Sequence, residues 1–338
     1  MIEFEALNCL LDRSIGKQAL TVTPLACDAS SRSYYRIQLD GGAKTAVACK
    51  YEPEMADQIP QFTRVADWLV ACEIPVPEII GFDQSKGLVL LEDLGDNQLF
   101  SKVKMFGEIG VQDYYKEALD QLLLLQLQPV DKKLFPLKLD KEKFFWELSF
   151  FLEHTERLYG SSLKLSPSIK KRLNDQFERL AQILDEEPEM IVHRDFHSKN
   201  LMVVDPEKSE EKQGLVYWID FQDARRGLCQ YDLVSLLRDS YVVLENYHHY
   251  LNYFLDRRQQ FTGEIINRED FISVFKLASI QRNLKAVGTF TSQANLYGNR
   301  SYLAYVKPTL NYVKQSLRRN PDCQELSALL TGSGILSL

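Results

Sequence analysis

Residues 191–204 read I-V-H-R-D-F-H-S-K-N-L-M-V-V, and residues 216–221 read V-Y-W-I-D-F. In both stretches short apolar runs border polar residues, which predicts short buried strands that carry polar side chains at their ends. The polar residues at these ends are His193, Asp195, Asn200 and Asp220. Carboxylates and an amide in this setting are typical of a phosphoryl-transfer site, so we take these stretches as the centre of the chain.

The spacing of Asp195 and Asn200 is that of a kinase catalytic loop, H-R-D-x-x-x-x-N. In such a loop the aspartate accepts the proton of the acceptor hydroxyl, and the asparagine binds magnesium. Asp220 is the candidate for the other metal ligand, because Mg²⁺ is small and hard and takes oxygen ligands. Each residue could instead cap backbone groups in a turn, but their joint spacing favours the site.

Asp220 is followed by Phe221, Gln222 and Asp223, where a protein kinase would read D-F-G. This difference argues against a mobile activation segment and favours a kinase of small molecules. The six cysteines form no C-x-x-C pair and the five histidines form no H-E-x-x-H motif. The sequence therefore does not indicate a thiolate or multi-histidine metal site.

The composition is that of an ordinary globular protein, with 338 residues, 45% of them hydrophobic and 26% charged. This length predicts one large domain or two closely packed ones. The net charge of -7 argues against a nucleic-acid partner, which would need a basic surface. The acidic N-terminus does not read as a signal peptide, and no apolar run approaches the ~20 residues of a membrane span. Because the cysteines are scattered and suggest no disulfide framework, we expect a cytoplasmic protein without a membrane partner.

The first hundred residues predict a small sheet with helices. Periodicity and turn residues indicate a helix within 1–20, a strand at 21–25, a hairpin at 40–42 with a second strand at 45–49, a helix at 57–72, and strands at 79–82 and 88–91. In the turn D-A-S-S-R-S, we expect Ser30, Ser31 and Arg32 to approach the phosphates of ATP. An ordinary polar turn is the alternative, because the stretch contains no glycine.

Lys50 directly follows the apolar run A-V-A-C, where a kinase places the lysine that reaches the α and β phosphates. Asp57 and Asp67 on the next helix are its candidate acidic partners, and a solvated lysine is the alternative. Glu92 and Leu94 begin the polar link after the strand L-V-L-L. We expect their backbone groups to bind the edge of adenine, as a hinge between two lobes would.

From about residue 111 the pattern is helical. Apolar stripes predict core helices near 114–125, 144–152, 169–184, 230–241 and 271–284. Asp232 and Arg238 are candidate substrate contacts; the alternatives are that Asp232 favours the helix dipole and that Arg238 pairs with it. Arg282 and Lys285, in Q-R-N-L-K, we interpret as solvated cations rather than as contacts for an anionic substrate.

These motifs resemble the aminoglycoside phosphotransferase family of small-molecule kinases. The matching pieces, in the family's order over most of residues 25–305, are D-A-S-S-R-S-Y-Y-R, L-L-E-D-L-G, H-R-D-F-H-S-K-N-L-M, I-D-F-Q-D-A, Y-D-L-V-S-L-L-R-D and Q-R-N-L-K-A-V-G-T-F. The last two are similar to those of the bacterial anomeric kinases of N-acetylmuramate and N-acetylglucosamine, which act in cell-wall recycling. Lys50 is a departure, because that group often has a different residue there.

The resemblance implies an α+β, protein-kinase-like fold with two lobes. Residues 1–95 would form an N-lobe with a small antiparallel sheet and a helix, and residues 96–338 a mainly helical C-lobe. ATP and Mg²⁺ are the implied cofactors, Asp195 the implied base, and His197 an implied contact of the transferring phosphoryl group. The implied partner is a small molecule, an amino sugar that is phosphorylated at its anomeric hydroxyl.

Two other functions stay open. A kinase of another small alcohol, such as an aminoglycoside, choline or a different sugar, would use the same residues, and a strongly acidic acceptor pocket would favour those cationic substrates. A non-catalytic nucleotide-binding protein is less favoured, because Asp195, Asn200 and Asp220 are all present. The acceptor pocket is assembled from distant helices, so the sequence does not identify the acceptor, nor the oligomeric state.

Overall fold

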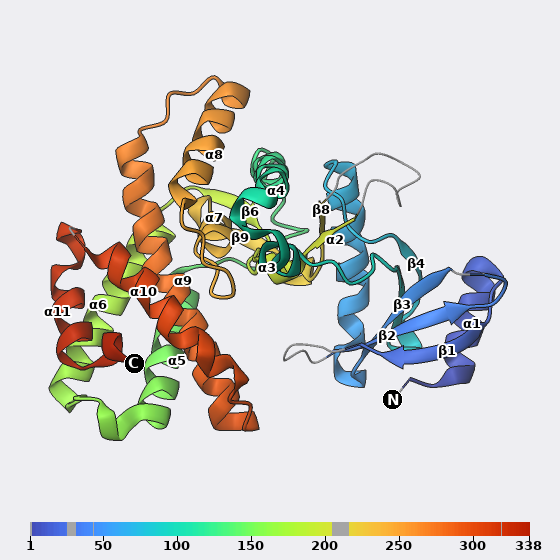
Figure 1. Ribbon diagram of the computed structural model, residues 1–338, viewed down its shortest axis with the longest axis horizontal. Coiled ribbons are helices and arrows are strands. Elements are labelled where there is room, and N and C mark those ends of the chain that lie inside the picture. Colours follow the sequence, from blue (N-terminus) through green and yellow to red (C-terminus); the bar gives the residue numbers. More distant parts are fainter. Residues whose placement is uncertain (1, 26–31, 43, 205–215, 319) are drawn as a thin grey trace. The chain divides into compact units, whose positions relative to one another are not determined.

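The structure is a computed structural model that describes residues 2–25, 32–42, 44–204, 216–318 and 320–338 (Figure 1). The chain divides into two compact units, each described below by itself. Unit 1 comprises Met1–Gln98 and Leu201–Gln222, and unit 2 comprises Leu99–Asn200 and Asp223–Leu338. This grouping differs from the expected division at residue 95, because a segment from the second half of the chain belongs with the N-terminal residues.

Unit 1 contains a five-stranded antiparallel sheet with the order β1-β2-β3-β5-β4. Its strands are β1 (Ala19–Pro24), β2 (Arg32–Leu39), β3 (Thr45–Tyr51), β4 (Ile79–Asp83) and β5 (Leu88–Glu92). Helix α1 (Phe4–Ile15) packs its leucines on one face of the sheet, against residues such as Ile37, Ala48 and Leu90. The helix is capped at its C-terminus by Gly16, which has φ 62, and it lies within the expected range 1–20.

The segment from residue 201 to 222 is a hairpin that packs within unit 1. Strands β7 (Leu201–Val203) and β8 (Val216–Trp218) pair antiparallel, as the sequence predicted, while the expected tip at 205–214 lies outside the described residues. Phe221 stacks on Phe62 of α2 (Ile59–Ala71) with ring centroids 5.0 Å apart. The backbone N–H of Trp218 donates to Pro75 O at 2.8 Å. These contacts fix Asp220, which lies between Trp218 and Phe221.

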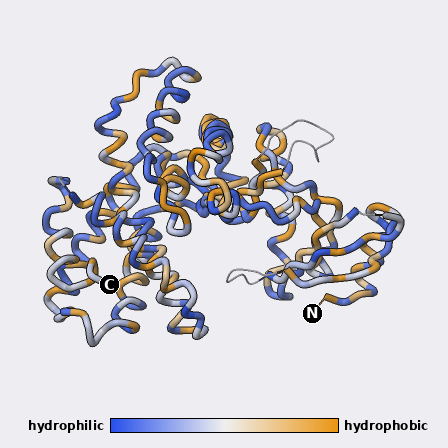
Figure 2. Tube along the Cα trace, viewed as in Figure 1, coloured by the Kyte–Doolittle hydropathy of each residue, from blue (hydrophilic) through white to orange (hydrophobic). Residues whose placement is uncertain are grey.

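Unit 2 is mainly helical. Its helices are α3 (Leu99–Gly110), α4 (Gln112–Gln126), α5 (Lys141–Tyr159), α6 (Pro167–Asp185), α7 (Gln230–Leu237), α8 (Tyr247–Thr262), α9 (Arg268–Tyr297), α10 (Val306–Leu317) and α11 (Gln324–Gly332). Strands β6 (Glu189–Val192) and β9 (Arg225–Leu228) form a short antiparallel pair. Along the helices, hydrophobic residues recur between hydrophilic ones (Figure 2), which gives each helix an apolar side to bury. The small antiparallel sheet of unit 1 and the helices of unit 2 confirm the expected fold class.

Helix α9 is the long central element of unit 2. It begins at Asn267, whose side chain accepts the N–H groups of Glu269 and Asp270, and it ends at Gly298 with φ 68. Its middle is buried between α5, α7 and α10. Gly288 permits the close approach of α5, because a Cβ placed there would lie 2.7 Å from the Cα of Phe151.

Two further properties concern the length of the apolar helices and the cysteines. No helix in the described ranges is long and apolar enough to span a bilayer. The cysteines within these ranges are free thiols: Cys9, Cys49, Cys72, Cys229 and Cys323. The fold of the described part of the chain is therefore held by packing and hydrogen bonds rather than by disulfides.

We expect the substitution Gly288→Ala to lower the free energy of unfolding by about 1–3 kcal/mol, because the new methyl group would overlap the backbone of α5. Urea unfolding followed by circular dichroism measures this change. Gly332→Ala is the matched control, since nothing lies within 4 Å of its Cβ position; it should be neutral or stabilising. Equal stability of the two variants would contradict the close α5–α9 approach.

Candidate active site

The loop of residues 193–200 follows β6 and contains the proposed base, Asp195; we call it the catalytic loop. Two buried aspartates hold it in place. Asp232, in the first turn of α7, accepts the backbone N–H groups of His193 at 2.6 Å and Arg194 at 3.0 Å. Asp239 accepts the backbone N–H of Ser198 at 2.9 Å and its hydroxyl at 2.5 Å. Both carboxylates are fully buried, so they supply acceptors where water cannot. The loop backbone is thereby fixed on both sides of the proposed base.

Arg194 adopts the left-handed backbone conformation, with φ 82. For a residue other than glycine this conformation costs of order 1–3 kcal/mol and persists only where its surroundings enforce it. Here the N–H of Arg194 bonds to Asp232, and its guanidinium donates to Asp223 at 3.0 Å and lies 3.6 Å from Glu147. The strained residue directly precedes Asp195, which places the strain at the site itself.

The contacts of Asp232 and Arg238 are not those expected of residues that bind a substrate. Both oxygens of Asp232 accept backbone N–H groups, and burial raises the pKa of this carboxyl to about 7 although those N–H groups lower it. Arg238 is buried with its guanidinium 3.4 Å from the ring centroid of Tyr247, and it donates to Gln315 at 2.8 Å. These contacts disfavour the predicted substrate roles: Asp232 holds the loop backbone, and Arg238 packs inside unit 2.

Asp239 was missed by the sequence reasoning. It stands seven residues after Asp232 in Y-D-L-V-S-L-L-R-D, two residues past the end of α7 at Leu237. That spacing could have indicated that both carboxylates serve the same loop. When the position of the loop is not known, however, an aspartate at a helix end is interpreted as a solvated residue that caps the helix.

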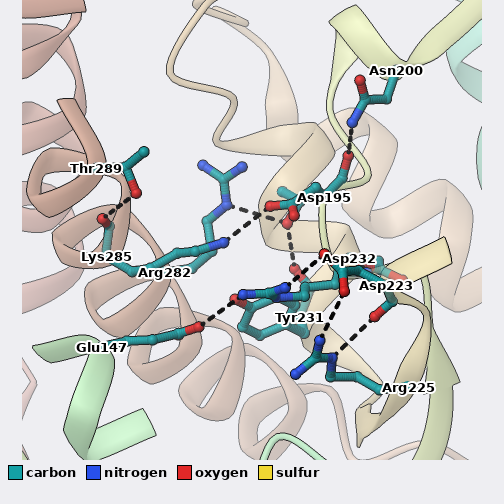
Figure 3. A network of polar contacts seen from close by, with 12 residues as sticks. Glu147, Asp195, Asn200, Asp223, Arg225, Tyr231, Asp232, Arg282, Lys285 and Thr289 are labelled. Carbon is teal, nitrogen blue, oxygen red and sulfur yellow. Dashed lines mark hydrogen bonds and ion pairs between the residues drawn. The ribbon is translucent and has the colours of Figure 1, made fainter. Parts of the chain in front are cut away.

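Asp195 bonds to a lysine from the middle of α9. Lys285 Nζ lies 3.0 Å from Asp195 Oδ1, and the exposed fractions of the two side chains are 15% and 30% (Figure 3). Burial by itself would raise the pKa of the Asp195 carboxyl, but the positive charges of Lys285 and Arg194 outweigh burial and hold that pKa well below its usual range. Oδ1 of the Asp195 carboxylate thus accepts a hydrogen bond from the ammonium group of Lys285.

The two cations of α9 are not solvated as we expected. Arg282 is 4% exposed and donates through Nε to Ser235 Oγ at 3.2 Å, while Lys285 reaches Asp195. The expectation was wrong because the stretch Q-R-N-L-K lies in the centre of a buried helix rather than beside a helix end. Periodicity alone could not show this, because α9 buries polar residues such as Gln281 and Asn283 together with its apolar ones.

His197 and Asn200 follow Asp195 in a tight turn. The backbone N–H of His197 donates to Asp195 O at 3.0 Å, and the ring of His197 meets Tyr241 edge-on at 5.2 Å. Asn200 Nδ2 donates to the same Asp195 carbonyl at 2.8 Å, so the amide oxygen is directed away from the loop (Figure 3). An amide oxygen held in this way suits a hard cation such as Mg²⁺.

In unit 1, Asp220 pairs with Arg32. Arg32 Nη2 lies 2.8 Å from Asp220 Oδ1, and Gln222 Nε2 donates to the same oxygen at 2.9 Å. Asp220 has φ 64, another left-handed residue at a predicted functional position, and its side chain is 40% exposed. The side chain of Arg32 is 9% exposed, and its guanidinium carbon lies 5.9 and 5.6 Å from the ring centroids of Tyr34 and Tyr51. A half-open carboxylate beside a fixed guanidinium fits a site for a cation and phosphate oxygens.

Lys50 lies on the opposite face of the sheet from Arg32. Arg32 is directly paired with Tyr51, whereas Lys50 is paired with Ser33, and side chains alternate between the faces of a strand. Lys50 shares its face with Ala48, which packs in the α1 core, and its Nζ donates to Lys86 O at 2.6 Å. Within the described residues this contact replaces the expected bond to Asp57 or Asp67, which disfavours a phosphate-binding role for Lys50.

The link after β5 is held by Arg36, a residue that the sequence reasoning did not single out. Arg36 forms a two-point ion pair with Asp93, at 2.6 and 3.0 Å, and a further hydrogen bond to Asp96 at 3.0 Å. The link thus starts in a defined conformation at Glu92 and Leu94, both half-buried, whose proposed adenine contacts are backbone groups. Of the other predicted nucleotide contacts, Ser30 and Ser31 lie outside the described residues.

Comparison with solved structures supports the fold described above. The gentamicin complex of APH(2")-IIa has a TM-score of 0.62 at 13% identity, covering 92% of this chain and 96% of that one. The choline kinase LicA from Streptococcus pneumoniae has a TM-score of 0.58 at 13% identity, covering 91% and 98%. At this level of identity the likeness shows the fold alone.

Sequence comparisons give the family. An N-acetylmuramate/N-acetylglucosamine kinase of Pseudomonas aeruginosa is 30% identical over 343 aligned residues, which cover 97% of this chain and 96% of that protein. A kinase with the same name from Neisseria meningitidis is 27% identical, covering 91% and 89%. The model of the phosphotransferase enzyme family matches residues 21–259. The resemblance seen in the motifs is thus confirmed, and this chain belongs to the phosphotransferase enzyme family.

Proposed function

We propose that this phosphotransferase is an ATP- and Mg²⁺-dependent kinase that transfers the γ phosphate to the anomeric C1 hydroxyl of N-acetylmuramate or N-acetylglucosamine. The observation that carries the proposal is the near full-length similarity to kinases named for these two sugars, at 27–30% identity. Its product, a sugar 1-phosphate, would suit a uridylyltransferase in cell-wall recycling. We place the reaction in the cytoplasm, where ATP and such sugars meet.

In this reaction Asp195 would orient the acceptor hydroxyl and accept its proton. A carboxylate with a depressed pKa is a weak base in the ground state, so its main contribution would be orientation, with proton transfer late in the reaction. His197, two residues on, would contact the transferring phosphoryl group. Because phosphoryl-transfer transition states are loose, positioning and charge neutralisation supply most of the acceleration.

The residues that would hold the cofactors are Asn200 and Asp220 for magnesium and Arg32 for the phosphates of ATP. The amide oxygen of Asn200 is directed away from its loop, and Asp220 is a half-open carboxylate, so both fit a hard cation. Bound magnesium would neutralise charge on the phosphates. Backbone groups at Glu92 and Leu94 would bind the edge of adenine.

A kinase of another small alcohol is the second candidate, since the fold is also that of the choline kinase compared above. Choline and aminoglycosides are cations, and a site for them would need acidic groups around the reacting hydroxyl. The largest charge effects on Asp195 come instead from Lys285, Arg194 and His197. This charge distribution favours a neutral or anionic acceptor, and N-acetylmuramate carries a carboxylate.

The proposal is tested by ADP release, coupled to NADH oxidation, with Mg²⁺ and ATP and with N-acetylmuramate, N-acetylglucosamine, galactosamine, kanamycin and choline in turn. Phosphorus NMR of the product then locates the phosphate. We expect turnover with the two N-acetylated sugars and a 1-phosphate product. Turnover with kanamycin or choline alone would reassign the acceptor, and phosphate on a hydroxyl other than C1 would refute anomeric transfer.

We expect Asp195→Asn to lower kcat by about 10²- to 10⁴-fold, because the amide cannot accept the hydroxyl proton. Affinity for ATP, measured by isothermal titration, should stay near that of the parent protein. Asp175→Asn, at an exposed position of α6, is the control and should retain full activity. A parent-like kcat for Asp195→Asn would rule out the assigned base.

Arg32 and Lys50 give a second, paired prediction. We expect Arg32→Met to raise the KM for ATP by about 10- to 100-fold, since a hydrogen-bonded charge of this kind contributes roughly 1.5–3 kcal/mol. Lys50→Met should change that KM by less than about threefold, because its exposed bond to a carbonyl is on the other face of the sheet. The reverse ranking in steady-state kinetics would restore Lys50 as the phosphate contact.

A further inference from the structure

We propose that Lys285 is a positioning residue for Asp195: its ammonium group holds Oδ1 of the carboxylate and leaves the second oxygen for the acceptor hydroxyl. The bond of 3.0 Å joins residues 90 positions apart in the chain. This inference rests on the role of Asp195 in the proposed function, but not on the identity of the acceptor.

The backbone of the catalytic loop is already fixed, and the side chain of Asp195 is what remains to be oriented. Asp232 binds the N–H groups of His193 and Arg194, Asp239 binds Ser198, and a turn bond joins the N–H of the next histidine to Asp195 O. None of these bonds involves the carboxylate of Asp195. Rotation about its side-chain torsions would move the reacting oxygen, and misplacement by about 1 Å can cost ~10²-fold in rate.

Lys285 is suited to fix this carboxylate because its own position is rigid. It lies in the middle of α9, next to the buried residues Leu284 and Ala286. Three residues further on, Gly288 lets the helix pack directly on the backbone of α5. On the preceding turn, Arg282 bonds to Ser235 of α7. A long side chain that starts from so constrained a backbone reaches Asp195 with little freedom to move elsewhere.

Two other roles for Lys285 give different outcomes. A lysine that binds the acceptor would affect the KM of that acceptor, because it would act on binding in both the ground state and the transition state. A lysine that only stabilises unit 2 would affect unfolding and leave both kinetic constants unchanged. A positioning residue instead lowers kcat, and it does so only while Asp195 is present.

The experiment compares the variants Lys285→Met, Lys285→Arg, Asp195→Asn and the double variant Asp195→Asn/Lys285→Met, with the acceptor that the parent enzyme turns over best. We expect Lys285→Met to lower kcat by about 10²-fold with KM for the acceptor within about threefold, and Lys285→Arg to restore part of the loss. The double variant should be no slower than Asp195→Asn, since Lys285 acts through that carboxylate. Lys276→Met, on the same helix and outside this polar network, is the matched control.

Thermal unfolding of each variant separates folding from function. If Lys285→Met does not fold, Lys285→Arg is the test variant, because arginine keeps the charge and changes only the geometry. A parent-like kcat of Lys285→Arg together with a raised KM for the acceptor overturns the proposal. A raised KM with parent-like kcat in Lys285→Met, or additive losses in the double variant, also overturns it. If the parent enzyme phosphorylates kanamycin and neither N-acetylated sugar, the proposed acceptor is wrong. The variants are then compared with kanamycin as the acceptor, so the role of Lys285 is still tested.

Discussion

The structure of the active site depends on one buried carboxylate, that of Asp232. Its two oxygens accept the N–H groups of His193 and Arg194, and Arg194 is held in a left-handed conformation that it would not adopt alone. A carboxylate without exposure to water is stable only when its lone pairs are satisfied, and a buried N–H needs an acceptor equally. Each group therefore requires the other, and the catalytic loop can take this shape only when α7 is in place.

Paired charges also occur at the two aspartates to which we assign the chemistry. Asp195, in unit 2, is paired with Lys285, and Asp220, in unit 1, is paired with Arg32. For Asp195, the positive charges of Lys285 and Arg194 hold the pKa of the carboxyl well below its usual range. An ionised carboxylate is what both assigned roles require, since a proton acceptor and a metal ligand must each offer a free pair of electrons. The partners differ, however: one comes from a long buried helix and the other from the first position of a strand.

Helix α9 joins stability to chemistry within unit 2. Close packing at Gly288 determines how near α9 lies to α5, and one turn before it Lys285 reaches the catalytic loop. Because the interior of a protein is closely packed, a change in the α5–α9 contact would shift the anchor of the lysine as well. The long helix thus serves as the rigid support of a side chain that bonds to the proposed base.

The sequence by itself determined the family and the class of fold, and it supplied the residues proposed for the chemistry. The spacing of Asp195 and Asn200, the strand that ends near Asp220 and the change from strand to helix patterns were readable because they are local. Only the tertiary structure decided which cation serves which carboxylate. The register of β2 and β3 disfavours Lys50 as a phosphate contact, and Lys285 was taken for a solvated cation because its partial burial depends on the helices around α9. Asp232 and Asp239 looked like ordinary helix residues until the loop was seen against them. These are contacts between residues far apart in the chain, and local patterns carry no information about the partner of a buried charge.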